Sequence, residues 1–574
     1  MKLRVLALDY DGTIATDGRL DPAVRAAIGR VRDLGHVVVL VTGRILDDLR
    51  SLVGDLRLFD AVVAENGAVV AFPSAGRSTQ LAPAPPATFV AELRRRHLDV
   101  RVGHCVVELA AADCMQALQV VREQELPLTL HFNRSRLMVL PQAVSKATGL
   151  REALRTLRLS PHNAVAIGDA ENDHELLAVC EVGAAVAWGS AALQRTADIV
   201  IPGSGPAAVA GYLDEVTRTD RIASPTGRRR LVLGRDRNGD VVTLAMRGRN
   251  ILIAGDPRSG KSWVGGLICE QLVVQQYCTC VLDPEGDYQE LEMLPGVSVL
   301  GGDGAPPSMN EVVRRLRHSD VSLVIDLSTL STTEKRDYVT GALRVLTDLR
   351  QRTGLPHRIV VDEAHYFLHE SGQATILDQS LAGHMLITYR VTGLDPGLLH
   401  GTDCVLVTRE TDPNEARLLH ATFRGEGDAS AWTDMLGDLD LDEAVLLPMD
   451  GGGLRRFRIA PRLTHHVRHR HKYLDVPVAA DRRFTFRFGD QQGPVVASLQ
   501  DLSNALARTP VERLSGHVQR GDLSRWIGDV VRDDALATAV RDLEERHRLG
   551  TLPDFNDAVI RVIHERYGTA SELL

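Results

Sequence analysis

The loop Gly255–Ser262, with the sequence Gly-Asp-Pro-Arg-Ser-Gly-Lys-Ser, restricts the fold of this chain more than any other stretch. The apolar run 250–254 before it is typical of a buried parallel strand, and apolar residues at helical spacing follow it. Glycines let backbone N–H groups face a phosphate, and the start of the helix adds the positive end of its dipole. The pattern predicts a nucleotide site in an α/β domain, and the alternative is a glycine-rich turn before a helix.

Each residue of this loop is a candidate for contact with ATP. Lys261 is expected to reach the β- and γ-phosphates, and the Ser262 hydroxyl is expected to hold Mg²⁺. The predicted ATP-binding residues are Gly255, Asp256, Pro257, Arg258, Ser259, Gly260, Lys261, Ser262 and Asp362.

An acidic pair follows the apolar run 358–361. Asp362 suits a water-mediated ligand of Mg²⁺, and Glu363 suits the catalytic base that polarises water for ATP hydrolysis. The same pair could be an ordinary helix N-cap. Because a phosphate loop lies about 100 residues upstream, the sequence favours the catalytic interpretation.

The length and charge of the chain limit its class. A chain of 574 residues is too long for one hydrophobic core and predicts about three domains. Its net charge of −9 excludes a basic surface overall, so any DNA contact would need local basic patches. The seven scattered cysteines indicate core thiols in a reducing compartment. An acid at position 9 comes too early for a signal peptide, and no apolar run is long enough for a membrane span, so we expect a cytoplasmic protein.

Polar residues at the ends of three apolar strands, with one lysine, mark a separate site near the N-terminus. They are Asp9–Thr13 after strand 4–8, Thr42–Arg44 after strand 37–41, Lys146 at the start of a helical stretch, and Gly168–Asp173 after strand 164–167. Two carboxylates two positions apart can divide the roles of nucleophile and proton carrier, and a divalent cation reduces their repulsion. Such a pair alone could be a turn, but the carboxyl ends of strands are where an open α/β sheet binds its ligand.

These segments, in this order, resemble the four motifs of haloacid-dehalogenase-superfamily phosphatases of the Cof type, similar to archaeal phosphoglycolate phosphatase and sucrose-phosphate phosphatase. The resemblance covers residues 1–215 and implies a Rossmann-like α/β fold. It implies that Asp9 is the nucleophile that forms an aspartyl-phosphate, and that Asp11 is the general acid and then the base. Thr42 and Lys146 would hold the phosphoryl oxygens. The residues implied to hold Mg²⁺ are Asp9, Asp11 through its carbonyl, Asp169 and Asp173.

An inserted α+β cap is expected at about residues 80–142, where it would select a phosphorylated small-molecule substrate. Its pattern predicts helix 86–96, strand 100–109, helix 111–125, and strands 127–132 and 136–140. The candidates for substrate contact, with solvated surface residues as the alternative, are Arg101, His104, His131 and Arg134. Glu65-Asn-Gly67 also fits a recurring element of the family, whereas Trp188 departs from it at a position that is often small or an amide.

Residues 216–235 are predicted to be a polar linker, in which Arg228–Arg230 are either solvated or a DNA-touching arm. Residues 236–474 resemble the additional-strand ATPases of the HerA/FtsK type. The segments that carry this resemblance are Gly255–Ser262, Leu282–Tyr288 and Val360–Phe367. The family implies a homo-oligomer, a hexameric ring that pumps DNA or peptides, with an arginine, Arg390 or Arg424, supplied across the interface.

Three departures from that family argue against DNA translocation while leaving nucleotide binding intact. Arg258 replaces the usual glycine before Ser-Gly-Lys, and Tyr389 stands where a polar sensor is expected. The β-barrel that normally precedes the ATPase core is replaced by the phosphatase-like part.

The C-terminal part carries no catalytic pattern. The histidine-rich stretch His465–Tyr473 is predicted to be an exposed connection, with a nucleic-acid phosphate contact as the alternative. It lacks the carboxylate or cysteine partners of a metal site. Residues 475–574 are predicted to be a small, mostly helical accessory module with Trp526 in its core.

The whole sequence predicts an α/β multidomain protein with a capped Rossmann-like phosphatase, a P-loop ATPase domain and a helical module. We expect a bifunctional hydrolase, in which a Mg²⁺-dependent phosphate monoester phosphatase is fused to an ATP-hydrolysing ring-type motor. One alternative is a phosphatase with a nucleotide-gated oligomerisation module that translocates nothing. Another is a nucleic-acid end-processing phosphatase coupled to a DNA translocase.

Overall fold

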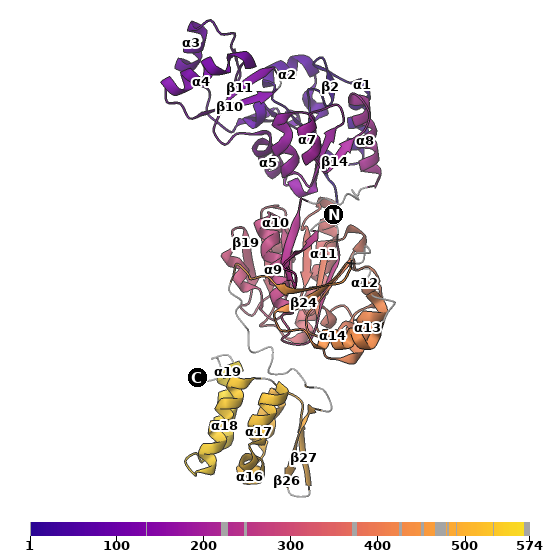
Figure 1. Cartoon of the computed structure of the whole chain (residues 1–574), viewed down its shortest axis with the longest axis vertical. Coiled ribbons are helices and arrows are strands. Elements are labelled where there is room, and N and C mark those ends of the chain that lie inside the picture. The colour runs from indigo at the N-terminus through magenta and orange to yellow at the C-terminus, as the bar shows by residue number, and fades with distance from the viewer. Residues whose placement is uncertain are drawn as a thin grey trace. The chain divides into compact units, whose positions relative to one another are not determined.

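The computed structural model describes residues 2–133, 135–219, 228–245, 249–369, 376–423, 428–448, 453–464, 478, 482–488, 491–531 and 533–567. The chain divides into two compact units. Figure 1 colours the chain by residue number. The larger unit comprises Met1–Pro284 and Leu291–Thr464, and the smaller comprises Glu285–Glu290 and His465–Leu574. The predictions for Arg134, Arg424 and the segment 465–473 fall outside the described residues.

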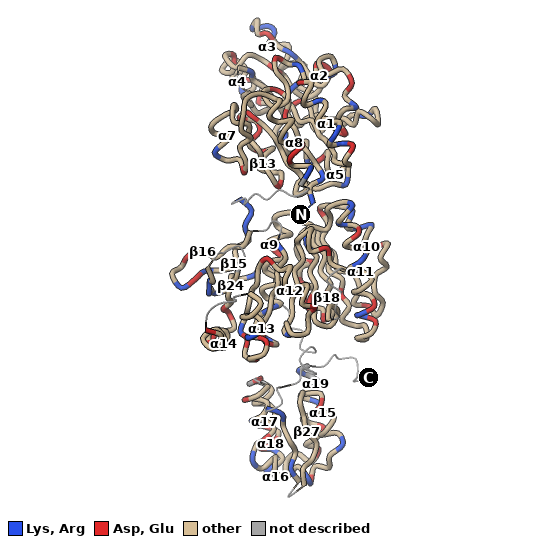
Figure 2. Tube along the Cα trace, turned by 90° about the vertical axis from the view of Figure 1, so that its right-hand side faces the viewer, with Lys and Arg blue, Asp and Glu red and all other residues tan. Residues whose placement is uncertain are grey.

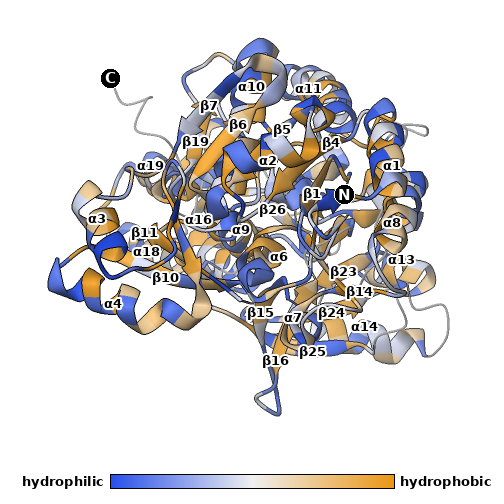
Figure 3. Cartoon of the chain, turned by 90° about the horizontal axis from the view of Figure 1, so that it is seen from above, coloured by the Kyte–Doolittle hydropathy of each residue, from blue (hydrophilic) through white to orange (hydrophobic). Residues whose placement is uncertain are grey.

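The first part of the larger unit is built on an eight-stranded sheet with the order β14-β13-β12-β1-β4-β5-β6-β7. Its strands are β1 (Val5–Asp9), β4 (Val37–Val41), β5 (Ala61–Ala64), β6 (Val69–Phe72), β7 (Arg77–Gln80), β12 (Ala164–Gly168), β13 (Val182–Val186) and β14 (Ile199–Ile201). β1 pairs in parallel with β4 and β12, whereas β6 and β7 add an antiparallel edge. Leu6 and Leu8 pack on one face of β1 and Val5 and Ala7 on the other, so the strand is apolar on both faces up to Asp9. Figure 3 colours the elements by hydropathy.

Helices cover both faces of this sheet. One face carries α1 (Pro22–Asp33), α2 (Leu46–Val53) and α8 (Pro206–Thr219), and the other carries α5 (Lys146–Leu157), α6 (His174–Val179) and α7 (Ala191–Thr196). The parallel strands β1, β4 and β12 all end at the same edge, because their registers are aligned. The residues that follow these strands therefore gather at one place, as the Rossmann-like prediction requires.

A small α+β cap is inserted between β7 and α5. It consists of α3 (Ala87–Arg95), β8 (Arg101–Val102), β9 (Val107–Ala110), α4 (Cys114–Glu123), β10 (Leu128–Asn133) and β11 (Arg136–Pro141), with the sheet order β10-β11-β9-β8. Val107, Leu109, Leu137 and Val139 alternate onto the face that α3 and α4 cover. The single strand predicted over 100–109 is wrong, because a turn at 103–106 divides it into β8 and β9.

The second part of the larger unit is an eleven-stranded sheet with the order β16-β15-β25-β24-β23-β17-β22-β21-β18-β20-β19. Its strands are β15 (Arg230–Asp236), β16 (Val241–Ala245), β17 (Ile251–Ala254), β18 (Thr279–Asp283), β19 (Val297–Gly301), β20 (Ser322–Asp326), β21 (Arg358–Val361), β22 (His384–Thr388), β23 (Cys404–Val407), β24 (Glu443–Pro448) and β25 (Arg455–Ile459). The strands from β23 to β19 are parallel, and the other four form an antiparallel edge. β22 lies between β17 and β21 and pairs with both.

Six described helices accompany this second sheet. They are α9 (Lys261–Val274), α10 (Met309–Leu316), α11 (Thr332–Thr353), α12 (Pro396–His400), α13 (Pro413–Phe423) and α14 (Ala429–Gly437). Much of the core is apolar side chains of α11, α13 and α14 packed on the parallel strands. Apolar clusters of the two sheets are separate. Where the sheets meet, Glu181 accepts a hydrogen bond from the Tyr277 hydroxyl at 2.7 Å, so this contact is polar.

The predicted linker 216–235 contains regular structure at both ends, because α8 extends to Thr219 and β15 begins at Arg230. Arg228 pairs with Asp198, and Arg229 donates to backbone carbonyls of residues 178–180. These two arginines are thus bound to the first sheet's domain, with Arg228 exposed and Arg229 half-buried. Acidic and basic residues are interspersed along both units (Figure 2).

The smaller unit is mostly helical, as predicted. It contains the hairpin β26 (Phe484–Phe488) and β27 (Gln491–Val496) and the helices α15 (Leu499–Arg508), α16 (Val511–Arg520), α17 (Asp522–Trp526), α18 (Asp534–Arg548) and α19 (Phe555–Tyr567). Trp526 is 6% exposed and belongs to its apolar core, which confirms that prediction. Among the described residues of the chain, no helix is long and apolar enough to span a bilayer.

Candidate functional site

Lys146 joins two carboxylates at the carboxyl edge of the first sheet. Its Nζ atom donates to Asp9 Oδ1 and Asp173 Oδ1, at 2.6 Å each, and its side chain is 1% exposed. Lys146 is the first residue of α5, which begins with a capping box at Ser145. A Cβ atom at Gly67, where φ is +106°, would lie 1.9 Å from the Ser145 carbonyl oxygen. The place of the lysine therefore depends on a glycine at position 67.

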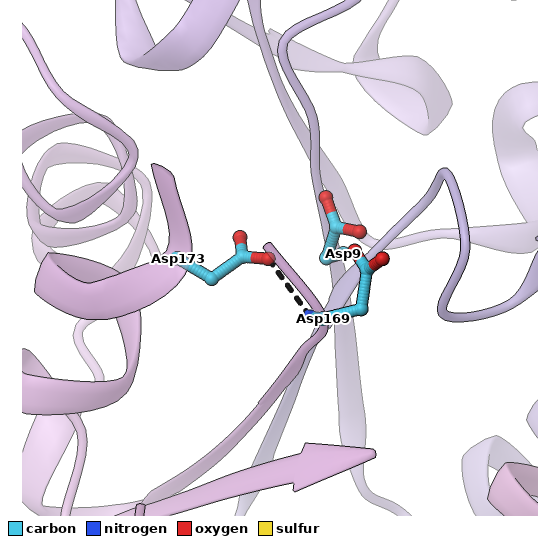
Figure 4. Close-up of side chains that lie close together, drawn as sticks. All are labelled: Asp9, Asp169 and Asp173. Atoms are coloured by element: carbon cyan, nitrogen blue, oxygen red, sulfur yellow. Dashed lines mark hydrogen bonds between the residues drawn. The ribbon is translucent and has the colours of Figure 1, made fainter. Parts of the chain in front are cut away.

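Asp9, Asp169 and Asp173 form a buried acidic cluster (Figure 4). One oxygen from each carboxylate lies within 4.8 Å of the other two. Asp173 Oδ2 accepts the backbone N–H groups of Asp169 and Ala170, at 3.0 and 3.1 Å. Burial raises the pKa of Asp9 well above its usual value, Asp173 and Asp169 raise it further, and Lys146 opposes them. The one positive charge of Lys146 therefore does not balance the negative charge of the carboxylates in this cluster.

The donor set of this cluster fits Mg²⁺. With the three carboxylates ionised, Lys146 leaves an excess of two negative charges, which one divalent cation would balance. Carboxylate and carbonyl oxygens are the ligands that Mg²⁺ prefers. Asp9 and Asp169 would hold the ion directly, and Asp173, already bonded to Lys146 and two N–H groups, would support them.

The structure pairs Asp11 with an arginine to which the sequence analysis gave no role. Arg44 donates from Nε to Asp11 Oδ2 at 2.7 Å and from Nη2 to Asp11 Oδ1 at 2.6 Å. Thr42 directly follows β4 in a buried position, and its hydroxyl accepts the Arg44 backbone N–H at 3.2 Å. The hydroxyl of Thr13 lies 3.5 Å from Asp169 Oδ1. The signal that could have indicated Arg44 is its place directly after β4, at the edge that Asp11 shares.

The match to known proteins covers this part of the chain. The haloacid dehalogenase-like hydrolase family matches residues 6–88 and 91–213. A phosphoglycolate phosphatase from Halorubrum lacusprofundi is 33% identical over 237 residues, which cover 38% of this chain and 98% of that protein. The chain belongs to this hydrolase family. A phosphoglycolate phosphatase from Aeropyrum pernix is 32% identical over 224 residues, or 35% of this chain and 89% of that protein. A solved haloacid dehalogenase-like hydrolase from Bacteroides thetaiotaomicron is 17% identical and covers 38% of this chain and all of its own, with a TM-score of 0.34.

Trp188 stabilises the hydrolase loop that carries Asp9 and Asp11. Its indole N–H donates to the Gly12 carbonyl oxygen at 2.7 Å. The next residue, Gly189, lies so close to Asp169 that a Cβ atom would be 2.6 Å from its carbonyl oxygen. The departure that the sequence showed at position 188 is thus a contact between two loops of the hydrolase site.

Glu65 connects the core of the hydrolase to its cap. Its carboxylate accepts the backbone N–H groups of His104, Cys105 and Val106, at 3.0, 2.7 and 3.2 Å, and the residue is fully buried. These bonds hold the turn that separates β8 from β9. A Cβ atom at Gly103 would lie 2.8 Å from this carboxylate, so the turn needs a glycine there.

Two residues of the cap that were predicted to contact the substrate, Arg101 and His104, lie near carboxylates of the core. Arg101 pairs with Asp48 of α2 and, at 3.3 Å, with Glu108, and His104 Nε2 lies 3.6 Å from Asp47. His131 is opposite Met138 in the register of β10 and β11. Met138 reaches the hydrolase core, because its sulfur would lie 3.0 Å from a Cβ atom on Gly43.

The Gly255–Ser262 loop lies between β17 and α9, as its sequence predicts. Lys261 Nζ donates to the Asp256 carbonyl oxygen at 2.7 Å, and Ser259 Oγ lies 2.5 Å from Thr408 Oγ1. A Cβ atom on Gly255, where φ is +147°, would lie 2.1 Å from the same Thr408 oxygen. The lysine side chain is therefore turned back along its own loop.

The remaining loop residues occupy the bend before α9 and its first turn. Pro257 and Arg258 form the bend, with Arg258 at φ +66°, and Gly260 is the N-cap of α9 at φ +99°. Ser262 lies in the first turn of α9, beside Lys261. Backbone N–H groups at the start of this helix are thus directed at the loop, which is the arrangement that binds phosphate.

The acidic pair Asp362 and Glu363 follows β21 and is buried. Glu363 has a φ of +47°, and its Oε2 lies 3.6 Å from Nδ1 of His365. Tyr389, at the end of β22, places its ring 5.9 Å from Lys261 Nζ. The strand order thus brings the residues after β17, β22 and β21 to one edge. Arg390 is exposed at this edge.

Glu410 lies near Asp256 of the Gly255–Ser262 loop, and the sequence analysis did not identify it. It is 1% exposed, and burial, followed by the nearby Asp256 carboxylate, raises its pKa to about 9. Asp256 accepts from the Thr411 hydroxyl at 2.8 Å and from its N–H at 3.1 Å. At neutral pH Glu410 is therefore a protonated acid that can donate to Asp256.

Proposed function

We propose that the hydrolase domain is a Mg²⁺-dependent phosphatase that cleaves phosphate monoesters through an aspartyl-phosphate on Asp9. The observation that carries this proposal is the buried Asp9 carboxylate beside Lys146, within reach of Asp169 and Asp173. Mg²⁺, when bound, would neutralise the charge that otherwise repels a phosphate dianion from these acids.

The residues of this chain would act in two steps. An Asp9 carboxylate oxygen attacks phosphorus while the ester oxygen leaves with a proton from Asp11, and the product alcohol departs. Water then attacks the aspartyl-phosphate, gives its proton to Asp11, and releases inorganic phosphate and Asp9. Lys146 and Thr42 are proposed to hold the phosphoryl oxygens, since both are buried, Lys146 at the start of α5 with its Nζ on Asp9 and Thr42 directly after β4.

The substrate is proposed to be a phosphorylated small molecule. This domain matches most of the length of the relatives that are named phosphoglycolate phosphatase. Phosphoglycolate is therefore the first compound to test. The cap places Arg101 and Met138 near the core, so a small substrate is favoured over a polymer.

Hydrolysis of p-nitrophenyl phosphate with Mg²⁺ tests the proposal. The wild-type protein should release phosphate, and Asp9→Asn should abolish the release. Asp33→Asn, at an exposed aspartate on α1, is the matched control and should retain it. Full activity in Asp9→Asn would contradict the proposed nucleophile.

We also propose that the second sheet forms an ATPase site. Its support is the position of β22 between β17 and β21, together with Lys261 at the start of α9 and buried Glu363 after β21. Lys261 and Ser262 would contact the phosphates and Mg²⁺, Asp362 would support the ion through water, and Glu363 would polarise the attacking water.

The larger assembly is a proposal with defined alternatives. A cytoplasmic homo-oligomer, a hexameric ring that moves DNA or another polymer, follows from the resemblance of residues 236–474 to ring ATPases. The alternatives are a nucleotide-gated oligomerisation module and a motor that serves a nucleic-acid end-processing phosphatase. Arg258 within the loop and Tyr389 beside Lys261 favour the module that translocates nothing.

ATP turnover and particle size separate these alternatives. A motor predicts turnover that DNA stimulates, that Glu363→Gln abolishes, and that occurs in a particle of several copies. The oligomerisation module predicts a size that changes with ATP and turnover that ignores DNA. Activity on 5′- or 3′-phosphorylated DNA above that on small phosphate esters would instead support end processing. A monomer with and without ATP would exclude both ring proposals.

A further inference from the structure

The fork between Arg44 and Asp11 engages both oxygens of the proposed acid. Two nearly parallel N–H···O bonds of 2.6 and 2.7 Å join the guanidinium to the carboxylate. Such a bidentate pair is the strongest geometry available to these two groups. Both oxygens of Asp11 therefore face the guanidinium, so the carboxyl group must turn away from Arg44 before it can approach the leaving group.

Arg44 is the more fixed member of the pair. Its guanidinium lies 5.6 Å from the centre of the Tyr10 ring, and a Cβ atom on Gly18 would be 3.3 Å from its Nη2 atom. The Tyr10 hydroxyl donates to the Gly18 carbonyl oxygen at 3.1 Å, which fixes the ring against the same turn. The side chain of Arg44 is 19% exposed, whereas that of Asp11 is 38% exposed. When the pair separates, Asp11 is therefore the side chain with room to move.

The charges around Arg44 come from both the core and the cap. Arg44 follows β4 in the core, and its pKa is raised chiefly by the hydrogen bonds to Asp11, with smaller contributions that include Glu108 of β9. Glu108 is itself paired with Arg101 and Arg136, at 3.3 and 3.2 Å. The guanidinium is thus bonded to Asp11 of the core and lies within electrostatic range of Glu108 of the cap.

We propose that Arg44 is a positioning residue that binds a second anionic group of the substrate, and that Asp11 occupies this arginine until the substrate replaces it. The proposal rests on the phosphatase function proposed above and specifies its substrates as phosphate monoesters with a carboxylate or similar anion near the ester. When the anion of the substrate replaces Asp11 on the arginine, Asp11 becomes free to act as the acid. Binding of the anion therefore also prepares the acid.

Substrate discrimination tests this role. Phosphoglycolate and 2-hydroxyethyl phosphate differ chiefly in a carboxylate against a neutral hydroxymethyl group. The ratio of their kcat/KM values in wild-type protein should be about tenfold or more, as one charged hydrogen-bonded contact gives. In Arg44→Gln the ratio should fall to within about threefold, and Arg44→Lys should restore part of it. Arg57→Gln, which breaks an exposed fork with Asp55, is the matched control and should keep the ratio.

Calorimetry supplies a readout that does not depend on turnover. The probe is 3-phosphonopropionate, in which a methylene replaces the ester oxygen of phosphoglycolate, and propylphosphonate is its uncharged-tail control, both with Mg²⁺ present. Asp11→Asn removes the competing carboxylate, so it should bind 3-phosphonopropionate about fivefold or more tightly than wild type, with less change for propylphosphonate.

Two results would overturn the role of Arg44. One is an unchanged discrimination ratio in a folded Arg44→Gln protein, and the other is equal or weaker binding of 3-phosphonopropionate to Asp11→Asn. Absence of p-nitrophenyl phosphate hydrolysis in the wild type would instead contradict the phosphatase proposal itself, so the two failures are distinguishable.

Discussion

The buried charges around Lys146 show how single residues maintain the hydrolase site. Burial alone would lower the pKa of this lysine, but Asp173 and Asp9 outweigh it and raise the pKa above its usual value. The lysine is therefore charged at neutral pH. Removing one partner of a buried ion pair leaves the other charge without compensation, and that is costly.

Lys146→Met should consequently destabilise the hydrolase domain by about 3–5 kcal/mol without metal and abolish phosphatase activity. Urea denaturation followed by fluorescence measures the first effect, and p-nitrophenyl phosphate hydrolysis measures the second. Lys335→Met, on α11 of the other sheet, is the control and should alter neither. A stable and active Lys146→Met protein would show that the two carboxylates do not need this cation.

Glu410 predicts a pH dependence of stability in the second sheet's domain. Its pKa is about 9 in the folded protein against an ordinary value near 4.5, so the folded state binds more protons between these values. Stability must then fall as pH rises, by at most about 1.4 kcal/mol per pH unit from this group.

Glu410→Gln should therefore flatten the loss of stability between pH 6 and pH 8 and raise the free energy of unfolding at pH 8. Urea titrations at three pH values give the slope. Glu292→Gln, at an exposed glutamate, should leave the slope as in wild type. A slope unchanged by Glu410→Gln would mean that other groups carry the pH dependence.

At the residue scale, a motif in the sequence indicates which residues belong to one site, but it does not indicate the contacts between two loops. Asp9, Lys146, Asp169 and Asp173 were all expected at one site, and the structure brings them together. The pairing of Arg44 with Asp11 depends on the relative orientation of the loops after β4 and β1, which spacing along the chain does not encode.

At the scale of elements, short contacts between loops and helix starts position the site. Gly67 lets the loop after β5 touch the first turn of α5, which carries Lys146. β-Carbon atoms cannot be accommodated at such a contact without displacing the backbone. Glycine at the half-buried position 29 of α1 has no such neighbour.

These two glycines make a matched pair. Gly67→Ala should lower the free energy of unfolding by several kcal/mol or prevent folding, because φ is +106° and the new carbon overlaps the Ser145 carbonyl. Gly29→Ala should stabilise the protein by about 0.5–1 kcal/mol, because alanine favours the helix. Thermal melting of both variants tests the pair, and a Gly67→Ala protein that melts like wild type would show that the contact can relax.

Element-scale prediction was limited by long-range pairing. The parallel strands were recognised from their apolar runs, whereas the antiparallel edge joins β15 to β25, more than 200 positions apart in the chain. The division of the strand predicted at 100–109 likewise results from Glu65, which lies outside the cap. A local pattern cannot reveal a partner that distant residues supply.

At the scale of the whole molecule, the larger unit contains two sheets with separate apolar cores and separate candidate phosphate sites. Their contact includes polar pairs such as Glu181 with Tyr277. The predicted order of the parts along the chain rests on the motif that each part carries. The contacts between the two sheets could not be predicted from the sequence, since they depend on surfaces that neither motif describes.

A ligand of one site should therefore stabilise the domain that contains this site and leave the other domain unchanged. Mg²⁺ at 100 times its dissociation constant should stabilise the hydrolase domain by about 2.7 kcal/mol, and a chelator should reverse this. Hydrogen exchange of the β1 and β12 amides measures the effect locally. Asp169→Asn should remove it, whereas Asp198→Asn, distant from the acidic cluster in sequence, should not. Equal protection of β17 and β21 by Mg²⁺ alone would contradict separate sites.

The three hydrogen bonds that Glu65 accepts from residues 104–106 give the cap a fixed point on the core. If the cap moves during a catalytic cycle, it must rotate about this point, because translation would break all three bonds at once. Displacements would then grow with distance from residue 65.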